Sequence, residues 1–82
     1  MFTVYILYSQ TFEKIYIGFT SNISVRLKSH NSENGKGFTN KFKPWTLVYS
    51  EEFSTKSEAM RREKQLKSAK GREFAWSIIS KQ

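Results

Sequence analysis

The 82-residue chain contains no cysteine, a single proline, a single histidine and no long apolar run. Without cysteine it can form neither a disulfide framework nor a thiolate metal site, so apolar packing and hydrogen bonds must hold the fold together. The N-terminus has no basic segment followed by an apolar stretch, and no stretch approaches the roughly 18 apolar residues that a membrane helix needs. We therefore expect a cytoplasmic protein.

Acidic residues are also scarce, because seven Asp and Glu stand against fourteen Lys and Arg, for a formal net charge of +7. A chain of this length forms one small domain, which we expect to span residues 1–82. Such an excess of positive charge on a small body attracts polyanions, and nucleic acid is the leading partner. The alternative is that the charge only keeps the protein soluble.

Strand and helix signals alternate along the first third of the chain. Residues 2–8 and 15–19 are rich in Val, Ile, Tyr and Phe and are separated by a turn, which is typical of a β-hairpin. Ile23 and Leu27 then begin an apolar stripe at helical spacing. We expect this helix to end near residue 30.

The middle of the chain predicts a loop, a strand and a capped helix. Residues 31–42 are polar and contain two glycines, which indicates a surface loop. Residues 45–53 follow the proline and have the composition of a third strand. Thr55 and Glu58 have the spacing of a capping box and open the next helix. The side chains expected on the inward stripe of that helix are Ala59, Met60, Glu63, Leu66 and Ala69.

Gly71 is the expected stop of this helix. A last short helix over residues 72–80 should follow it. The side chains that this helix is expected to bury are Phe74, Ala75, Ile78 and Ile79. The element order is thus β-β-α-β-α-α, which predicts an α/β (α+β) fold with a small three-stranded antiparallel sheet flanked by helices.

Glu63 interrupts an otherwise apolar stripe, with Ala59 and Leu66 as its neighbours on the helix face. A carboxylate at such a position is costly unless it is paired or binds a metal ion. Two structural alternatives remain open, a salt bridge to Arg26 or a lysine, and a rotation of the helix that exposes Glu63.

Arg26 and His30 are four residues apart and therefore share one face of the first helix. Their position beside the apolar stripe places them near the strands that carry Tyr5 and Tyr16. The planar guanidinium of arginine matches a phosphate group, and the ordinary pKa of histidine suits proton transfer. Two tyrosines, an arginine, a histidine and a carboxylate on one basic domain together indicate phosphodiester chemistry.

Five strings of residues, taken in order, resemble the GIY-YIG nuclease superfamily. They are Val4-Tyr5-Ile6, Tyr16-Ile17-Gly18, Arg26-Leu27-Lys28-Ser29-His30, Trp45-Thr46-Leu47-Val48-Tyr49 and Glu58-Ala59-Met60-Arg61-Arg62-Glu63. The chain looks most similar to small stand-alone bacterial members, which are similar to the nuclease module of the bacterial excision-repair endonuclease.

The resemblance implies a metal-dependent endonuclease that acts on DNA, in preference to RNA, with low sequence specificity and in DNA repair or processing. It assigns catalytic roles to Tyr5, Tyr16, Arg26 and His30. Tyr16 would act as general base or orient the attacking water, with Tyr5 as its partner on the adjacent strand. Arg26 would stabilise charge on the phosphate, His30 would lie near the scissile phosphate, and Glu63 would hold one divalent cation, Mg²⁺ or Mn²⁺.

A further set of residues is expected to contact nucleic acid, namely Gly18, Lys36, Thr39, Lys41, Lys43 and Arg62. Residues 36–45 interleave lysines with aromatic residues, a mixture suited to phosphate contact and base stacking. Alternatively, these aromatic residues pin a long loop to the core. Two other functions remain open: a non-catalytic nucleic-acid-binding module, and a protein-interaction domain with a vestigial site. Because no targeting domain is attached, a protein partner could supply specificity.

Overall fold

The computed structural model describes residues 1–31 and 41–81, and its elements follow the predicted order in an α+β fold. These elements are β1 (Phe2–Ser9), β2 (Lys14–Thr20), α1 (Ile23–Asn31), β3 (Thr46–Phe53), α3 (Lys56–Leu66) and α4 (Ala69–Ser80). None of the described helices combines the length and the apolar character that crossing a lipid bilayer requires.

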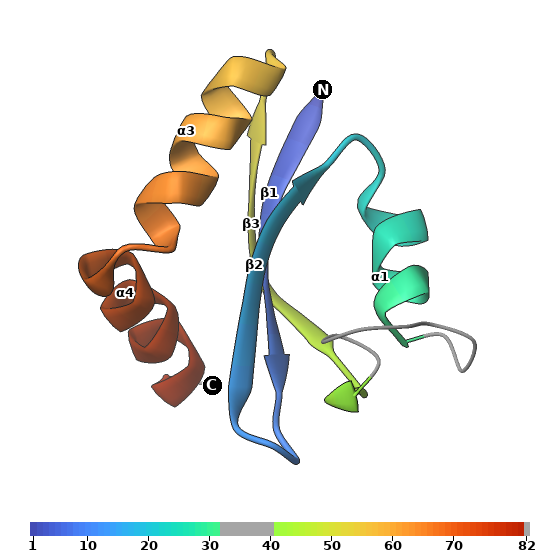
Figure 1. Cartoon of the computed structure of the whole chain (residues 1–82), viewed down its shortest axis with the longest axis vertical. Coiled ribbons are helices and arrows are strands. Elements are labelled where there is room, and N and C mark those ends of the chain that lie inside the picture. The colour runs from blue at the N-terminus through green and yellow to red at the C-terminus, as the bar shows by residue number, and fades with distance from the viewer. Residues whose placement is uncertain (32–40, 82) are drawn as a thin grey trace.

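The three strands form the predicted antiparallel sheet, and their order in it is β2-β1-β3. Helices α3 and α4 cover one face of this sheet and α1 covers the other, as Figure 1 shows. Because side chains alternate along a strand, the central strand β1 sends successive residues to opposite faces. The register places Tyr5 opposite Gly18 and Leu7 opposite Tyr16, so these four residues belong to the same face.

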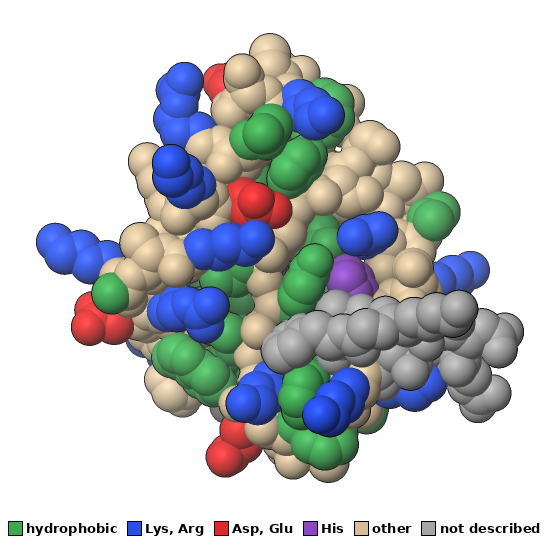
Figure 2. Space-filling model, viewed as in Figure 1, with side chains coloured by type: hydrophobic (Ala, Val, Ile, Leu, Met, Phe, Trp, Pro, Cys, Tyr) green, Lys and Arg blue, Asp and Glu red, His purple; other side chains and the backbone are tan. Residues whose placement is uncertain are grey.

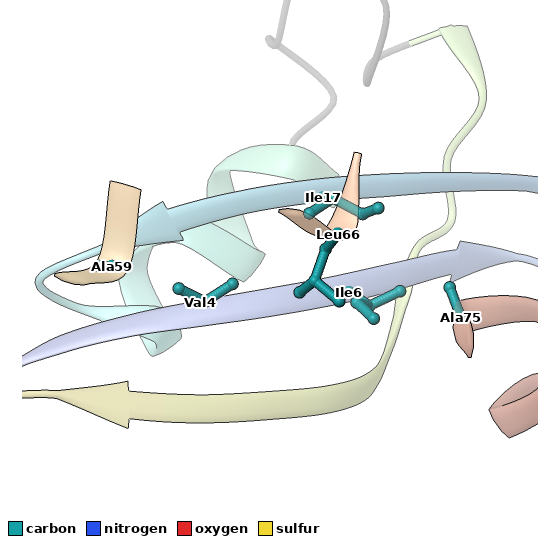
Figure 3. Close-up of a cluster of buried hydrophobic side chains, with 6 residues drawn as sticks. All are labelled: Val4, Ile6, Ile17, Ala59, Leu66 and Ala75. Carbon is teal, nitrogen blue, oxygen red and sulfur yellow. The ribbon is translucent and has the colours of Figure 1, made fainter. Parts of the chain in front are cut away.

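The face under α3 and α4 carries an aliphatic core (Figure 3). Its buried members are Val4, Ile6, Ile17, Ala59, Leu66 and Ala75. Full burial of one such side chain as large as leucine is worth about 1.5–3 kcal/mol, so this cluster is the main source of stability in a small domain.

The face under α1 is built mainly from aromatic side chains. Tyr5, Leu7 and Trp45 are buried there, and Ile23 and Leu27 of α1 pack against them as the sequence predicted. Apolar residues of α1 therefore attach the helix to the sheet, while its polar residues face the rim of the aromatic cluster.

The predicted capping box at the start of α3 is confirmed. The Thr55 side chain accepts from the Glu58 backbone N–H at 3.3 Å, and the Glu58 carboxylate accepts from the Thr55 backbone N–H at 3.3 Å. The predicted inward stripe is correct for Ala59 and Leu66, which are buried. It is wrong for Met60, which is 50% exposed because it lies on the solvent side of the helix.

The end of α3 also differs from the prediction. The helix stops at Leu66, and Ser68 caps α4 by accepting from the Gly71 backbone N–H at 3.3 Å. Ala69, predicted to lie on the inward stripe of α3, is an exposed first residue of α4. Gly71 is therefore not a helix stop but a buried residue in the first turn of α4, where a Cβ atom would lie 2.3 Å from the Gln65 carbonyl oxygen. Glycine is needed because α4 starts directly against the last turn of α3.

The last helix buries less than the sequence predicted. Ala75 is fully buried, but Phe74 remains 37% exposed and instead packs its ring edge-to-face on Tyr49 of β3, with centroids 5.2 Å apart. Ile78 and Ile79 are partly buried. The face of α4 that meets the core is thus centred on Ala75, and Phe74 lies at the rim of the core.

Candidate active site

Tyr5 and His30 form a buried hydrogen-bonded pair beneath α1. The distance between the Tyr5 hydroxyl and His30 Nε2 is 3.0 Å, and the residues are 1% and 5% exposed. Burial, helped by the nearby Arg26 guanidinium, lowers the pKa of His30, and burial raises the pKa of Tyr5. Both groups are therefore neutral near pH 7, and the hydrogen bond joins a tyrosine hydroxyl to a neutral imidazole, whose tautomer decides which of the two donates.

Tyr16 lies beside this pair on the adjacent strand. Its ring centroid is 4.8 Å from that of His30 and 6.3 Å from that of Tyr5, and Trp45 packs edge-to-face at 6.2 Å. Aromatic contacts at these separations fix the ring orientation. The two tyrosines and the histidine that the sequence singled out are thus brought together by the β1–β2 register and the last turn of α1.

Gly18 makes this arrangement sterically possible. A Cβ atom at Gly18 would lie 2.7 Å from the Tyr5 hydroxyl oxygen and 3.2 Å from a ring carbon of Tyr16. The absent side chain therefore leaves room for the Tyr5 ring to lie across β2. The predicted contact of Gly18 with nucleic acid stays a prediction.

Arg26 adds a positive charge at the rim of the cluster. This exposed residue lies one helical turn before His30. Its guanidinium interacts first with the Tyr5 hydroxyl and also with Tyr16, and these interactions raise the pKa of Arg26. Because the guanidinium remains charged and partly open to solvent, it can favour a tyrosinate or bind a phosphate oxygen.

Glu63 approaches the same tyrosines from α3. Burial is the main cause of the raised Tyr5 pKa, and the negative charge of Glu63 adds a smaller contribution, so the two groups are within electrostatic reach. The Glu63 side chain is 23% exposed, and its Oε1 lies 3.6 Å from Lys67 Nζ. A lysine pair, one of the two alternatives that the sequence left open, is thus present.

Glu63 is a carboxylate that the described residues offer as a cation ligand near Tyr5. Within residues 1–31 and 41–81, no three or more His, Cys, Asp or Glu side chains gather where they could hold a metal ion. Mg²⁺ usually keeps several waters and binds through one or two carboxylates and substrate phosphates. The partly exposed oxygens of Glu63 fit that mode of binding.

The other residues expected to contact nucleic acid are dispersed. Lys36 and Thr39 lie outside the described residues. Lys41 is exposed, and its Nζ lies 5.7 Å from the centroid of the Phe42 ring. Lys43 is the residue after Phe42. Arg62 belongs to α3, and its Nε donates to the Glu51 carboxylate of β3 at 3.0 Å. Contact of these residues with nucleic acid stays a prediction.

Sequence reasoning missed two features of the site. Lys67 beside Glu63 had an available signal, because the two residues have i, i+4 spacing on one helix. The role of the Asn31 side chain had no signal in the sequence. Its Nδ2 donates to the Trp45 carbonyl at 3.0 Å, and its Oδ1 accepts from the Trp45 N–H at 2.6 Å, which holds the end of α1 next to the start of β3.

Known proteins share this sequence and fold. Residues 1–75 match the family model described as the GIY-YIG catalytic domain. A UPF0213 protein of Staphylococcus haemolyticus is 47% identical over 53 residues, which make up 65% of this chain and 65% of that protein. The match thus spans just under two thirds of that relative. A UPF0213 protein of Natronomonas pharaonis is 40% identical over 65 residues, which cover 79% of this chain and 75% of that protein.

The fold has a solved counterpart as well. The solution NMR structure of a UPF0213 protein from Bacillus halodurans superposes with a TM-score of 0.55 at 30% identity, covering 95% of this chain and 85% of that one. The resemblance noted in the sequence is therefore confirmed, and the chain belongs to the GIY-YIG nuclease family.

Proposed function

We propose that the protein is an endonuclease that hydrolyses phosphodiester bonds in DNA with the help of one divalent cation, in DNA repair or processing. One observation carries the proposal: Tyr5, Tyr16 and His30 are in mutual contact, and a charged arginine and a single carboxylate lie within reach of them. A fold that served only to bind nucleic acid would need the positive surface but not this cluster.

Tyr16 is the proposed general base, or the group that orients the attacking water. The Arg26 guanidinium interacts with Tyr16 as well as with Tyr5, so it places a positive charge beside the proposed base. The same guanidinium can stabilise negative charge that develops on the phosphate.

The Tyr5–His30 pair is the proposed proton reservoir of the site. The lowered pKa of His30 keeps its imidazole unprotonated near pH 7, so it can take up a proton. The Tyr5 hydroxyl connects this imidazole to the rim where Arg26 lies. A buried pair of neutral groups also positions the Tyr16 ring without adding a charge beneath it.

Glu63 is the proposed ligand of one Mg²⁺ or Mn²⁺ ion. When bound, such a cation activates water and offsets charge on the leaving oxygen. The lone, partly exposed carboxylate supports this role, since water and substrate oxygens can complete the coordination. Lys67 neutralises the carboxylate in the metal-free protein and must release it when the ion binds.

Nucleic acid is the proposed substrate because of the formal net charge of +7. Lysine and arginine contacts to phosphates release condensed counterions, so we expect binding that weakens steeply as salt rises. The described site has no base-reading element of its own that would select a sequence. We therefore propose low intrinsic specificity, with selection of target left to a protein partner.

Nicking of supercoiled plasmid tests the proposal most directly. The wild type should nick the plasmid with Mg²⁺ or Mn²⁺ and not with EDTA, and Glu63→Gln should abolish nicking while leaving the fold and most DNA binding intact. Glu73→Gln, which removes an exposed carboxylate of α4, is the matched control and should nick like the wild type. Nicking by Glu63→Gln at the wild-type rate would contradict the role of Glu63 as cation ligand. Binding without any nicking by the wild type would favour the non-catalytic binding module.

A further inference from the structure

A hollow of about 320 Å³ lies beside the candidate active site, on the other side of Tyr16 from His30. Its lining residues are Ile15, Tyr16, Ile17, Lys67 and Arg72. The first three belong to β2, Lys67 is the C-cap of α3, and Arg72 lies in the first turn of α4. The hollow thus sits between an edge of the described sheet and the junction of two helices, on a face where basic side chains border β2 (Figure 2).

The hollow is continuous with the candidate active site at two points. Tyr16 lines the hollow and also contacts His30, with ring centroids 4.8 Å apart. The Lys67 ammonium lies 3.6 Å from Glu63 Oε1. A strand of nucleic acid whose scissile phosphate lies at Tyr16 would therefore meet the hollow as its next binding surface.

The charge of the hollow is suited to an anion. Lys67 is 50% exposed and pairs loosely with Glu63, so its ammonium can turn towards a ligand. Arg72 is exposed, and in the described part of the chain no acidic group lies within ion-pair distance of it. The positive charges of Lys67 and Arg72 thus outnumber the one negative charge of Glu63. The net charge of the hollow would become more positive if a divalent cation bound Glu63.

The walls of the hollow are suited to a phosphodiester backbone in particular. In the sheet formed by residues 1–31 and 41–81, β2 is an edge strand, so alternate backbone N–H groups along it have no partner in that sheet and point outward, where they can donate to phosphate oxygens. Ile15 and Ile17 add an apolar wall against which a sugar can pack. A free acidic peptide would use the two cations but has no sugar to place on that wall.

We propose, on the basis of the nuclease function above, that this hollow holds a second phosphate of the strand being cut, with Lys67 and Arg72 as its ligands. Lys67 then has two positions. It pairs with Glu63 in the free protein and turns to the phosphate when nucleic acid binds.

Equilibrium binding of a fluorescent 20-nucleotide DNA, single-stranded and duplex, in EDTA and at several salt concentrations tests this proposal. Each lost phosphate contact reduces the slope of log K against log salt by about 0.7–0.9. The double variant Lys67→Gln/Arg72→Gln should therefore reduce the slope by about 1.4–1.8 and weaken binding by about 25- to 60-fold at 0.1 M salt.

Two further double variants serve as controls. Lys56→Gln/Lys81→Gln removes the same charge from the far ends of α3 and α4, both exposed positions, and should change the slope by less than one contact. Lys67→Arg/Arg72→Lys keeps both charges and should bind like the wild type. Equal losses from the two charge-removing variants would overturn the proposal, since the loss would then follow net charge and not the hollow.

Plasmid nicking by the same variants separates this inference from the proposed function. If the wild type cuts and Lys67→Gln/Arg72→Gln behaves like the Lys56→Gln/Lys81→Gln control in both assays, the hollow is not a phosphate site although the nuclease function stands. If the slope falls as expected but no protein cuts with Mg²⁺ or Mn²⁺, the hollow binds phosphate and the nuclease function is wrong.

Discussion

The two faces of the sheet share one central strand but are built from different chemistry. Towards α3 and α4, β1 presents Val4 and Ile6, and every buried side chain of that cluster is aliphatic. Towards α1 it presents Tyr5 and Leu7, and both buried polar residues among those described, Ser9 and His30, belong to this face. A strand with period-two alternation can thus serve stability with one set of residues and chemistry with the other.

The difference shows where the stability of the protein originates. Burial of an aliphatic side chain on the α3–α4 face stabilises the folded protein whatever its neighbours donate or accept. Burial of a polar group on the α1 face is costly unless that group has a hydrogen-bond partner. The α3–α4 face also holds the helix that carries Glu63. We therefore expect removal of a polar group on the α1 face to reduce activity at nearly constant stability, and truncation of a buried aliphatic side chain on the α3–α4 face to reduce stability while leaving activity in the folded protein nearly unchanged.

The largest expected effect is on cleavage rate, from the α1 face. Tyr16→Phe and Arg26→Ala should each slow single-turnover cleavage by about 10²- to 10⁴-fold, because each removes a group that acts on the transition state. The double variant should be little slower than the slower single one, since both groups act on the same step. Tyr8→Phe, on the other face against Trp76, should cleave like the wild type. If Tyr16→Phe and Arg26→Ala changed the cleavage rate by only a few-fold, the catalytic roles of Tyr16 and Arg26 would be wrong.

The α3–α4 face should give the largest loss of stability. Leu66 is 1% exposed, and Leu66→Ala should lower the free energy of unfolding by about 2–5 kcal/mol through lost burial and the cavity left behind. Met60→Ala, at a half-exposed position of the same helix, should cost well under that. Urea denaturation measures both variants. If Leu66→Ala kept its stability but lost its cleavage rate at a temperature where it is folded, the division between the faces would be wrong.

Gly18 should affect both properties, because it supports the site and lies within the sheet. Gly18→Ala places a methyl group against the Tyr5 hydroxyl, and we expect a loss of about 1–3 kcal/mol from overpacking together with slower cleavage. Tyr5→Phe removes the nearest clashing atom. The double variant Gly18→Ala/Tyr5→Phe should therefore recover part of the stability but none of the activity, as thermal melting and plasmid nicking would show. Additive losses of stability would contradict the steric argument.

The pH dependence of stability should also differ between the faces. His30 has a lowered pKa in the folded protein because it is buried beside Arg26, so the unfolded chain binds its proton more readily. The free energy of unfolding should therefore fall as pH drops below about 6.5, the ordinary histidine pKa, and it should be flat above that value. In His30→Gln, whose amide does not take up a proton in this range, this decrease should disappear. Melting temperatures at pH 7.5 and 5.5 would reveal it, and parallel decreases in both proteins would assign it to other groups.

The smallest effect is expected at Ser9, whose buried hydroxyl has no hydrogen-bond partner among the described residues. An unsatisfied buried polar atom is unfavourable, so Ser9→Ala should leave the free energy of unfolding unchanged or raise it by up to about 1 kcal/mol. The midpoint of urea denaturation measures this change. A clear loss of stability would mean that the hydroxyl forms a bond in solution.

Local patterns in the sequence predicted most of the fold and the composition of the site. Strand alternation, the capping box at Thr55 and the spacing of Arg26 and His30 depend on neighbours within one element, so they can be read without a structure. The place of Arg26 and His30 near Tyr5 and Tyr16 followed from the apolar stripe beside them, and their catalytic roles followed from family resemblance. The buried position of Gly71 could not be predicted, because it depends on how closely α4 starts against α3.

The same limit explains what was missed around the site. The hollow combines residues 15–17 of β2 with Lys67 and Arg72, and its existence depends on the packing of α3 and α4 on the sheet. No periodicity in the sequence reports a contact between positions so far apart. The exposed position of Met60 likewise depends on the rotation of α3, which Ala59 and Leu66 determine through the core.

The two hydrogen bonds between the Asn31 side chain and the Trp45 backbone have a consequence for protein engineering. The asparagine amide pairs with a backbone N–H and a backbone carbonyl as a neighbouring strand would. It thereby joins position 31 to position 45 directly. The end of α1 and the start of β3 are therefore held together by their own atoms. A foreign recognition peptide introduced between positions 31 and 45 should leave this clamp, and with it the place of His30, unchanged.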